Sequence, residues 1–142
     1  VLKIKYDRVV NETLVSGPGL MNIFWALHEI KSKYFSECSS EEIFNQINNN
    51  ELAKQSTEIF FEILGQVAGD FALAIGAFDG VLIAGDLANN HAAQIKESRF
   101  RFGFENKDNY QDLMKKIPTS LVNVSELGLL GIHQFFNANK AE

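Results

Sequence analysis

The sequence predicts an α/β domain that is rich in helix and contains a short mixed sheet. Residues 51–75 form a long amphipathic stretch whose apolar positions recur three and four residues apart, which is typical of one continuous helix face. These positions are Phe60, Leu64, Val67, Phe71 and Ala74. Residues 81–84 form an apolar run without polar alternation, which is typical of a strand covered on both faces of a parallel or mixed sheet. We therefore expect a long helix, a tight turn and a buried strand at the centre of the fold.

Length and composition favour one globular domain and exclude two classes of partner. The chain has 142 residues, 46% of them hydrophobic, and a formal net charge of −5. Without a basic stripe that could neutralise phosphates or lipid headgroups, we expect no nucleic-acid and no membrane partner. Cys38 is the single cysteine, so no internal disulfide can form, and no apolar run approaches the roughly 18 residues of a membrane span. The expected location is cytoplasmic. Because the sequence begins on Val1 inside an apolar stretch, it also indicates a fragment of a longer chain.

The first part of the chain predicts helices with recognisable starts. Residues 1–6 alternate apolar with basic side chains, which fits either a half-buried strand or the last turns of a helix. After a β-branched segment at residues 9–15, Ser16 or Gly17 is expected to cap, and Pro18 to open, a helix that ends near Lys33.

Two more helix starts and a helix contact follow from residue type and spacing. Ser39 and Glu42 stand at the spacing of a capping box and predict a short helix, and one asparagine of residues 48–50 is expected to cap the long helix. Gly65 and Gly69 lie four residues apart on that long helix, where each costs about 1 kcal/mol relative to alanine. We therefore expect close packing of another helix against them.

The last third predicts short elements around a second strand. Asp86 is expected to cap a helix over residues 87–98, since aspartate is a good N-cap. The alternating phenylalanines of residues 100–104 fit a strand or a helix equally well. Residues 109–116 predict a helical turn or two before Pro118, residues 119–124 a second strand, and Ser125 the cap of a final helix.

Five landmarks in matching order and spacing resemble the C-terminal part of bacterial glucokinases, over essentially the whole chain. They are Glu12, the turn Ser16-Gly17-Pro18-Gly19-Leu20, the run from Gly76 to Gly85, Pro118, and Gly128-Leu129-Leu130-Gly131. The resemblance implies the larger domain of an actin- and hexokinase-like (ribonuclease H-like) ATP-dependent sugar kinase. Residues 1–142 then form one partial domain, and the helix at about residues 125–142 is expected to pack toward the missing smaller domain.

The resemblance also implies substrates and site residues. A glutamate four residues before the Ser-Gly-Pro-Gly turn binds sugar hydroxyls in that family, and Glu12 stands there. Charge-assisted hydrogen bonds suit a carboxylate to this task. Residues that match the segments flanking the adenosine of ATP are Ser16, Gly17, Pro18, Gly19, Leu20, Gly85, Asp86 and Leu87. The implied reaction is the phosphorylation of glucose or a related hexose by ATP with Mg²⁺ at the entry to glycolysis, with the missing N-terminal half as partner and a homodimer as a further possibility.

The chain departs from the family in two respects. The phosphate loop, the catalytic aspartate and the Glu-x-x-His sugar motif lie in the family before the position of Val1, so we expect no catalytic residue here and no activity of this chain alone. Asp86 stands where the family usually has a second glycine. A phosphate at about 4 Å would be repelled by on the order of 4 kcal/mol at an effective dielectric of 20, whereas adenosine would hardly be affected. The alternative is therefore a non-catalytic nucleotide- or sugar-binding module, or a dimerisation remnant, that has lost ATP binding.

Other candidate chemistries are weaker. His28, His91 and His133 are far apart and form no metal-ligand spacing with Cys38, so we expect no metal site and place these histidines on helix faces or the surface.

Overall fold

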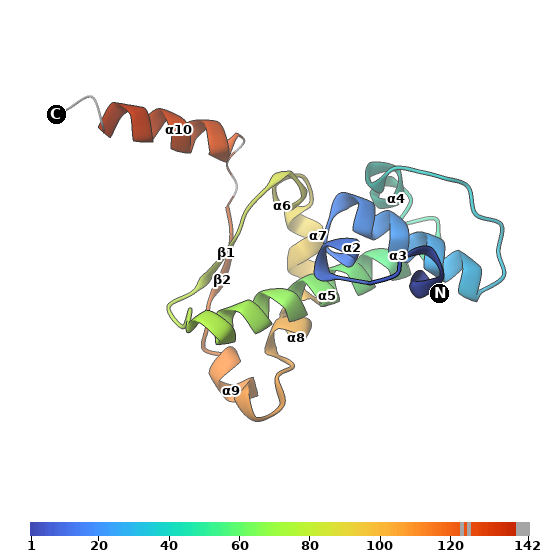
Figure 1. Cartoon of the computed structure of the whole chain (residues 1–142), viewed down its shortest axis with the longest axis horizontal. Coiled ribbons are helices and arrows are strands. Elements are labelled where there is room, and N and C mark those ends of the chain that lie inside the picture. Colours follow the sequence, from blue (N-terminus) through green and yellow to red (C-terminus); the bar gives the residue numbers. More distant parts are fainter. Residues whose placement is uncertain (123, 125, 139–142) are drawn as a thin grey trace.

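The computed structural model describes residues 1–122, 124 and 126–138, and most of them are helical (Figure 1). The helices before the first strand are α1 (Leu2–Lys5), α2 (Asn11–Leu14), α3 (Gly17–Ile30), α4 (Ser40–Asn45) and α5 (Glu51–Ile75). They are followed by β1 (Val81–Ile83), α6 (Asp86–Asn90), α7 (Ala92–Glu97), α8 (Phe100–Glu105), the 3-10 turn η1 (Asp108–Tyr110), α9 (Gln111–Met114), β2 (Thr119–Leu121) and α10 (Leu127–Ala138). Two segments that the sequence left undecided between strand and helix are thus helical. Residues 1–6 contain the helical turn α1, and the alternating phenylalanines of residues 100–104 lie in α8.

The long helix α5 is the centre of the molecule, with α3 and α4 near its start and the two strands near its end (Figure 1). Side chains from α3, α4 and α5 join those of α8 and α9 in one apolar core. Its largest fully buried members include Leu20, Ile43, Phe60, Phe61 and Phe104.

The predicted close packing at Gly65 and Gly69 is confirmed, and the neighbour is α8. A Cβ atom added to Gly65 would overlap the carbonyl oxygen of Phe100, and one on Gly69 would lie 2.6 Å from the carbonyl oxygen of Phe104. Gly103 of α8 has the reciprocal relation, because a Cβ there would overlap the carbonyl oxygen of Glu62 on α5. The two helices therefore meet backbone to backbone, which only glycine permits.

The prediction of which face of α5 is buried is wrong toward the end of the helix. Phe71 is 60% exposed and Ala74 is also exposed, whereas Ala72 is buried. The buried stripe follows the glycines instead, since α8 approaches along Gly65 and Gly69. Helix periodicity identified the helix correctly, and the small residues decided which side of it is covered.

The sheet consists of one parallel pair, β1 and β2, with Val81 opposite Thr119 and Ile83 opposite Leu121. Val81 and Ile83 are half-buried against the core, whereas Leu82 is 72% exposed. The expectation of a strand covered on both faces is therefore wrong for this chain, because its described helices cover one face of the pair only. No antiparallel neighbour makes the sheet mixed among the described residues.

Arg101 of α8 fixes the position of β2 and, through it, of β1. Its guanidinium donates hydrogen bonds to the carbonyl oxygens of Ile117 at 2.8 Å, Met114 at 3.0 Å and Lys115 at 3.1 Å. These carbonyl groups lie at the end of α9 and in the segment that leads into β2. The last carbonyl groups of a helix have no hydrogen-bond partner within the helix, so the arginine satisfies them. The arginine thus ties the strand pair to the α5–α8 crossing.

Three of the predicted helix starts are confirmed by side-chain caps. Ser16 accepts from the backbone N–H of Gly19, Ser39 and Glu42 form the capping box, and Asn50 accepts from the N–H groups of Leu52 and Ala53. The fourth predicted helix start, a cap by Asp86, is wrong. Gly85, at φ 118°, takes the cap position of α6, Asp86 is the first residue of the helix, and no side chain caps it. The helix expected over residues 87–98 is also divided at His91, which leaves helical geometry at φ −125° and ψ 30°.

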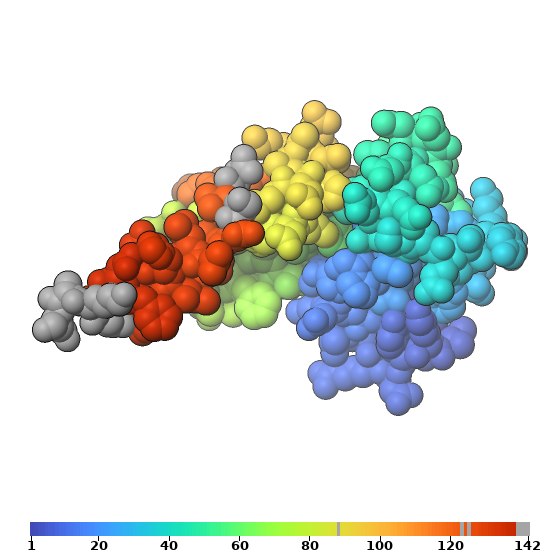
Figure 2. All heavy atoms as spheres, turned by 90° about the horizontal axis from the view of Figure 1, so that it is seen from above, coloured from blue at the N-terminus to red at the C-terminus, as the bar shows by residue number. Residues whose placement is uncertain are grey.

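The last helix, α10, extends away from the body of the molecule at the end opposite to α1–α4 (Figures 1 and 2). None of its described residues is buried. Ser125, the expected cap of this helix, lies outside the described residues. Among the described residues, no helix has the length and apolar character needed to cross a membrane.

Candidate functional site

A cavity of about 610 Å³ lies where the start of α3, the helix α4 and the helix α6 meet. Its lining consists of Gly17, Ser40, Glu41, Phe44, Asn45, Asp86, Leu87, Asn90 and His91. The cavity thus brings together two segments that are far apart in the sequence, the Ser-Gly-Pro-Gly turn and the turn that follows β1. In Figure 2 the yellow segment containing α6 lies beside the teal segment of α4 and the blue start of α3.

The first wall is shaped by the cap of α3. The hydroxyl of Ser16 accepts a hydrogen bond from the backbone N–H of Gly19 at 3.0 Å and donates one to the carbonyl oxygen of Glu12 at 2.8 Å. It therefore holds α2 and the start of α3 in one arrangement. Ser40 is the first residue of α4 and stands next to Ser39, whose N–H donates to Glu42 Oε2 at 2.7 Å in the capping box.

Glycine is favoured at each position of the two turns for a different physical reason. A Cβ on Gly19 would overlap the backbone of Leu14, so this glycine lets α2 approach α3. A Cβ on Gly17 would meet Ser40 Oγ at an ordinary 3.6 Å, which leaves space on the cavity side. Gly85 has no atom within 4 Å of such a Cβ, but its φ of 118° is a conformation that favours glycine.

The predicted nucleotide-binding residues therefore differ in accessibility. Gly17, Asp86 and Leu87 line the cavity, whereas Gly19 and Leu20 are buried beneath the turn. Ser16 is half-buried and Pro18 is exposed. Gly85 lines a smaller hollow of about 400 Å³ on the other side of Asp86, together with Asn89 and the start of α10. Asn89 closes that hollow by donating to the carbonyl oxygen of Val124 at 2.9 Å.

His91 and Phe44 form the aromatic part of the lining. Their rings are stacked, with centroids 3.6 Å apart and planes inclined by 18°. The Nδ1 atom of His91 is buried and has no hydrogen-bond partner among the described residues. Burial lowers the pKa of His91 below its ordinary value, and the carboxylate of Glu41 opposes this shift. Sequence reasoning missed His91 as a site residue, since only the fold brings α4 against the end of α6.

Charge decides which part of a ligand this cavity suits. Its lining contains the carboxylates of Glu41 and Asp86 and the amides of Asn45 and Asn90, but neither lysine nor arginine. Two carboxylates repel phosphates, whereas amides and an aromatic ring are compatible with a neutral, hydrogen-bonding group. The cavity therefore fits a nucleoside better than a triphosphate.

Glu12 lies outside this cavity, exposed in the first turn of α2. The orientation of α2 depends on Asn22, a buried residue of α3 whose amide donates to the carbonyl oxygen of Thr13 at 3.0 Å. Asn22 Oδ1 in turn accepts from the hydroxyl of Tyr6 at 2.8 Å and the ammonium of Lys5 at 3.2 Å. Sequence reasoning missed Asn22, because nothing in its spacing distinguishes it from a surface polar residue.

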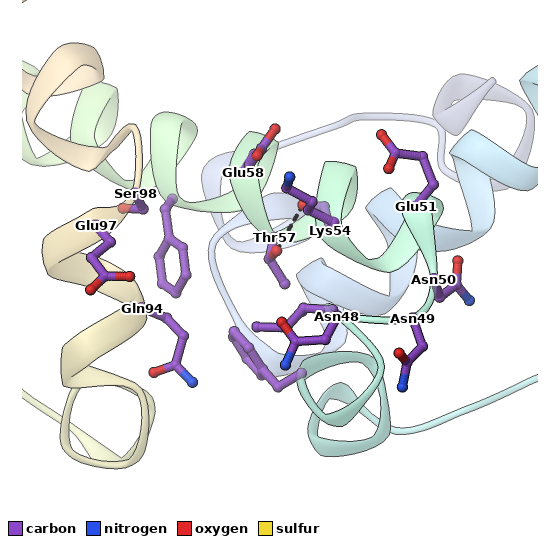
Figure 3. A pocket seen from close by; sticks show the side chains of 13 residues that line it. Asn48, Asn49, Asn50, Glu51, Lys54, Thr57, Glu58, Gln94, Glu97 and Ser98 are labelled. Atoms are coloured by element: carbon purple, nitrogen blue, oxygen red, sulfur yellow. Dashed lines mark hydrogen bonds between the residues drawn. The ribbon is translucent and has the colours of Figure 1, made fainter.

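A second cavity, of about 540 Å³, also has Phe44 in its lining. Figure 3 shows its polar side chains. Asn48, Asn49 and Glu51 come from the start of α5 and the loop before it, and Gln94 and Glu97 from α7 on the facing side. Thr57 donates to the carbonyl oxygen of Lys54 at 2.8 Å, and Asn50 is already the cap of α5. Two of its polar groups therefore serve the helix itself, and none of the predicted site residues lies there.

The described residues do not fit a metal site of their own, because no three histidine, cysteine, aspartate or glutamate side chains gather among them. A divalent cation would need oxygen ligands from elsewhere, such as the phosphates of a bound nucleotide.

The fold and the cavity together define a class: a helix-rich α/β unit with a cavity beside the turn that follows a parallel strand, where ligand sites of parallel sheets commonly lie. A family model described as Glucokinase matches residues 1–139. The chain belongs to the glucokinase family, and the resemblance seen in the sequence is confirmed.

The relatives agree in sequence and in structure. The chain is 34% identical to a glucokinase of Nitrobacter hamburgensis over 134 residues, which are 93% of this chain and 42% of that protein. It is 36% identical to a glucokinase of Xylella fastidiosa over 132 residues, or 92% of this chain and 39% of that protein. A crystal structure of a glucokinase from an Antarctic psychrotroph superimposes with a TM-score of 0.84 at 29% identity, covering 92% of this chain and 41% of that one. The chain thus spans about two fifths of the length of these relatives, and the expected fold is confirmed for that part.

Proposed function

We propose that this chain is the C-terminal part of an ATP-dependent glucokinase that transfers the γ-phosphoryl group of ATP to the 6-hydroxyl of glucose or a related hexose. The observation that carries the proposal is the cavity in which Gly17 meets Asp86 and Leu87 at the carboxyl end of β1. Membership of the glucokinase family supports the same reading. The role in glycolysis and a cytoplasmic location are part of this proposal.

The adenosine of ATP occupies this cavity. Gly17, Asp86 and Leu87 contact it directly, and Ser16, Pro18 and Gly85 shape the two turns. Gly19 and Leu20 are buried, so they act by holding the first turn in place. The phosphates lie outside the cavity, because Glu41 and Asp86 would repel them inside it.

Glu12 binds the hydroxyls of the sugar. Its exposed position on α2 leaves the carboxylate accessible, and its backbone is held by Ser16, which donates to the carbonyl oxygen of Glu12, and by Asn22, which donates to that of Thr13. Mg²⁺ neutralises charge on the transferred phosphoryl group. The catalytic base and the phosphate-binding loops belong to the N-terminal half of the protein, as the family resemblance implies.

The helix α10 packs against that N-terminal half. Its exposed apolar side chains include Leu129, Ile132, Phe135 and Phe136, which are 55–67% exposed. A contiguous apolar surface of this kind is unfavourable in water and marks a contact surface. If the protein is a homodimer, we propose that two chains pair through this same surface.

A second candidate function is a non-catalytic nucleotide- or sugar-binding module or a dimerisation remnant. The observation that favours it is the carboxylate of Asp86 in the cavity, at a position where the family resemblance implies glycine.

The test is a kinetic comparison of the full-length protein with its Glu12→Gln variant. We expect glucose phosphorylation by the unaltered protein and a KM for glucose raised about tenfold or more in the variant, because a charge-assisted hydrogen bond is lost. The KM for ATP should stay within about twofold. Glu29→Gln, at an exposed glutamate near the end of α3, is the matched control. Binding without any turnover in the unaltered protein would favour the module, and an unchanged KM for glucose would remove Glu12 from the sugar site.

A further inference from the structure

We infer that the outer face of the His91 imidazole is the platform on which the nucleobase stacks, which makes His91 a base-binding residue of the nucleotide cavity. This inference rests on the proposed function, since it assumes that a nucleoside occupies the cavity. It assigns a role to a residue that the family's sequence landmarks leave out.

The stacking geometry supplies the first step. Phe44 is only 4% exposed, because His91 covers one face of its ring at 3.6 Å and Phe61 packs nearby with centroids 5.9 Å apart. Phe44 therefore has little accessible surface to offer a ligand. His91 is half-buried and lines the cavity, and because Phe44 covers one face of its ring, stacking on a ligand there would use its second face.

The support beneath the ring supplies the second step. A ring that already lies on Phe44 is fixed in one orientation, so a ligand does not have to order it on binding. The break between α6 and α7 falls on His91, and its backbone geometry places the side chain against α4 instead of continuing one helix. The division of the expected helix thus has a structural consequence inside the cavity.

The chemistry of the lining supplies the third step. Burial lowers the pKa of His91, which favours the neutral imidazole, and a neutral ring can stack on a neutral base without charge. Asn45 and Asn90, whose amides both donate and accept hydrogen bonds, lie in the same lining and can contact the edge of a base. Stacking tolerates any base, so the ring sets the affinity for a nucleobase as a class.

Three variants of the full-length protein separate stacking from packing. His91→Phe keeps an aromatic ring, His91→Leu keeps an apolar side chain on Phe44 without one, and His91→Ala removes both. The probes are adenosine and inorganic tripolyphosphate, with dissociation constants measured by calorimetry and folding checked by the thermal midpoint. Gln94→Ala, on α7 and outside this cavity, is the matched control.

We expect the leucine and alanine variants to bind adenosine about tenfold or more weakly, and the phenylalanine variant to stay within about twofold. Tripolyphosphate binding should not change in any of them. Wild-type affinity for adenosine in folded His91→Leu protein would overturn the platform and leave the proposed function intact. A loss in His91→Phe as large as in His91→Ala would also overturn it, in favour of a polar contact. If the unaltered protein binds neither adenosine nor ATP, both the platform and the proposed function fail.

Discussion

Ser16 and Glu12 are joined by a hydrogen bond from the Ser16 hydroxyl to the Glu12 carbonyl oxygen, 2.8 Å long. The same hydroxyl accepts from Gly19 N–H and so caps α3. One side chain thus links the segment proposed to hold sugar to the turn proposed to hold nucleotide.

Replacing Ser16 by alanine should therefore disturb both substrates. We expect a loss of about 1 kcal/mol in the free energy of unfolding, since an N-cap is removed. The KM values for glucose and for ATP should rise together in the full-length protein, and Ser16→Thr should restore both. A rise in only one of the two constants would show that the segments are independent.

The crossing of α5 and α8 should be intolerant of a single methyl group at Gly65. An added Cβ would overlap the carbonyl oxygen of Phe100, and overpacking of this kind costs typically 1–3 kcal/mol or more. Gly131→Ala in α10 is the control, because nothing lies within 4 Å of its Cβ position and alanine favours helix by about 1 kcal/mol. Urea denaturation that gave equal midpoints for Gly65→Ala and the unaltered protein would contradict the crossing.

Stability should fall as the pH is lowered through the range in which His91 titrates. The folded state lowers the pKa of His91, mainly through burial, so the unfolded chain binds more protons at mildly acidic pH. This contribution is complete above the ordinary histidine pKa of about 6.5 and is lost as the pH falls toward the lowered value. We expect the thermal midpoint to decrease over this range and the decrease to shrink in His91→Phe. An identical pH profile in both proteins would show that His91 does not carry the effect.

Asp86→Gly introduces the glycine that the family resemblance implies at this position, and it should change the binding of the phosphates without changing that of the adenosine. Asp86 makes no side-chain cap, and a charge in the first turn of a helix contributes only about 0.3–1 kcal/mol, so stability should change little. With the phosphates outside the cavity, we expect ATP to bind about threefold to tenfold more tightly as the repulsion disappears. Adenosine should stay within about twofold. An equal gain for adenosine would mean that Asp86 obstructs the base directly.

Much of the fold was predictable from local rules. The caps at Ser16, Ser39 and Asn50 follow from residue type and spacing, and Gly65 with Gly69 indicated a helix contact, since each glycine is costly unless close packing requires it. The family resemblance also pointed to the Gly17 and Asp86 turns, which the fold places on one cavity.

The remaining features depend on tertiary contacts that periodicity does not record. Phe71 is exposed because α8 follows the glycines on another side of α5, and Leu82 is exposed because the helices cover one face of the strand pair. Asp86 could not be distinguished from a cap, since Gly85 takes that position through a positive φ. His91 gains its place only when α4 folds against the end of α6.

The central claim is that the nucleoside of ATP occupies the cavity between α3, α4 and α6. Titration of adenosine into isotope-labelled full-length protein, followed by backbone amide NMR, tests this claim most directly. We predict saturable shifts for Gly17, Leu87 and His91, with Gly65 at the α5–α8 crossing unchanged as an internal reference. Shifts that instead gather around Asn48, Lys54 and Gln94, in the second cavity, would contradict the account.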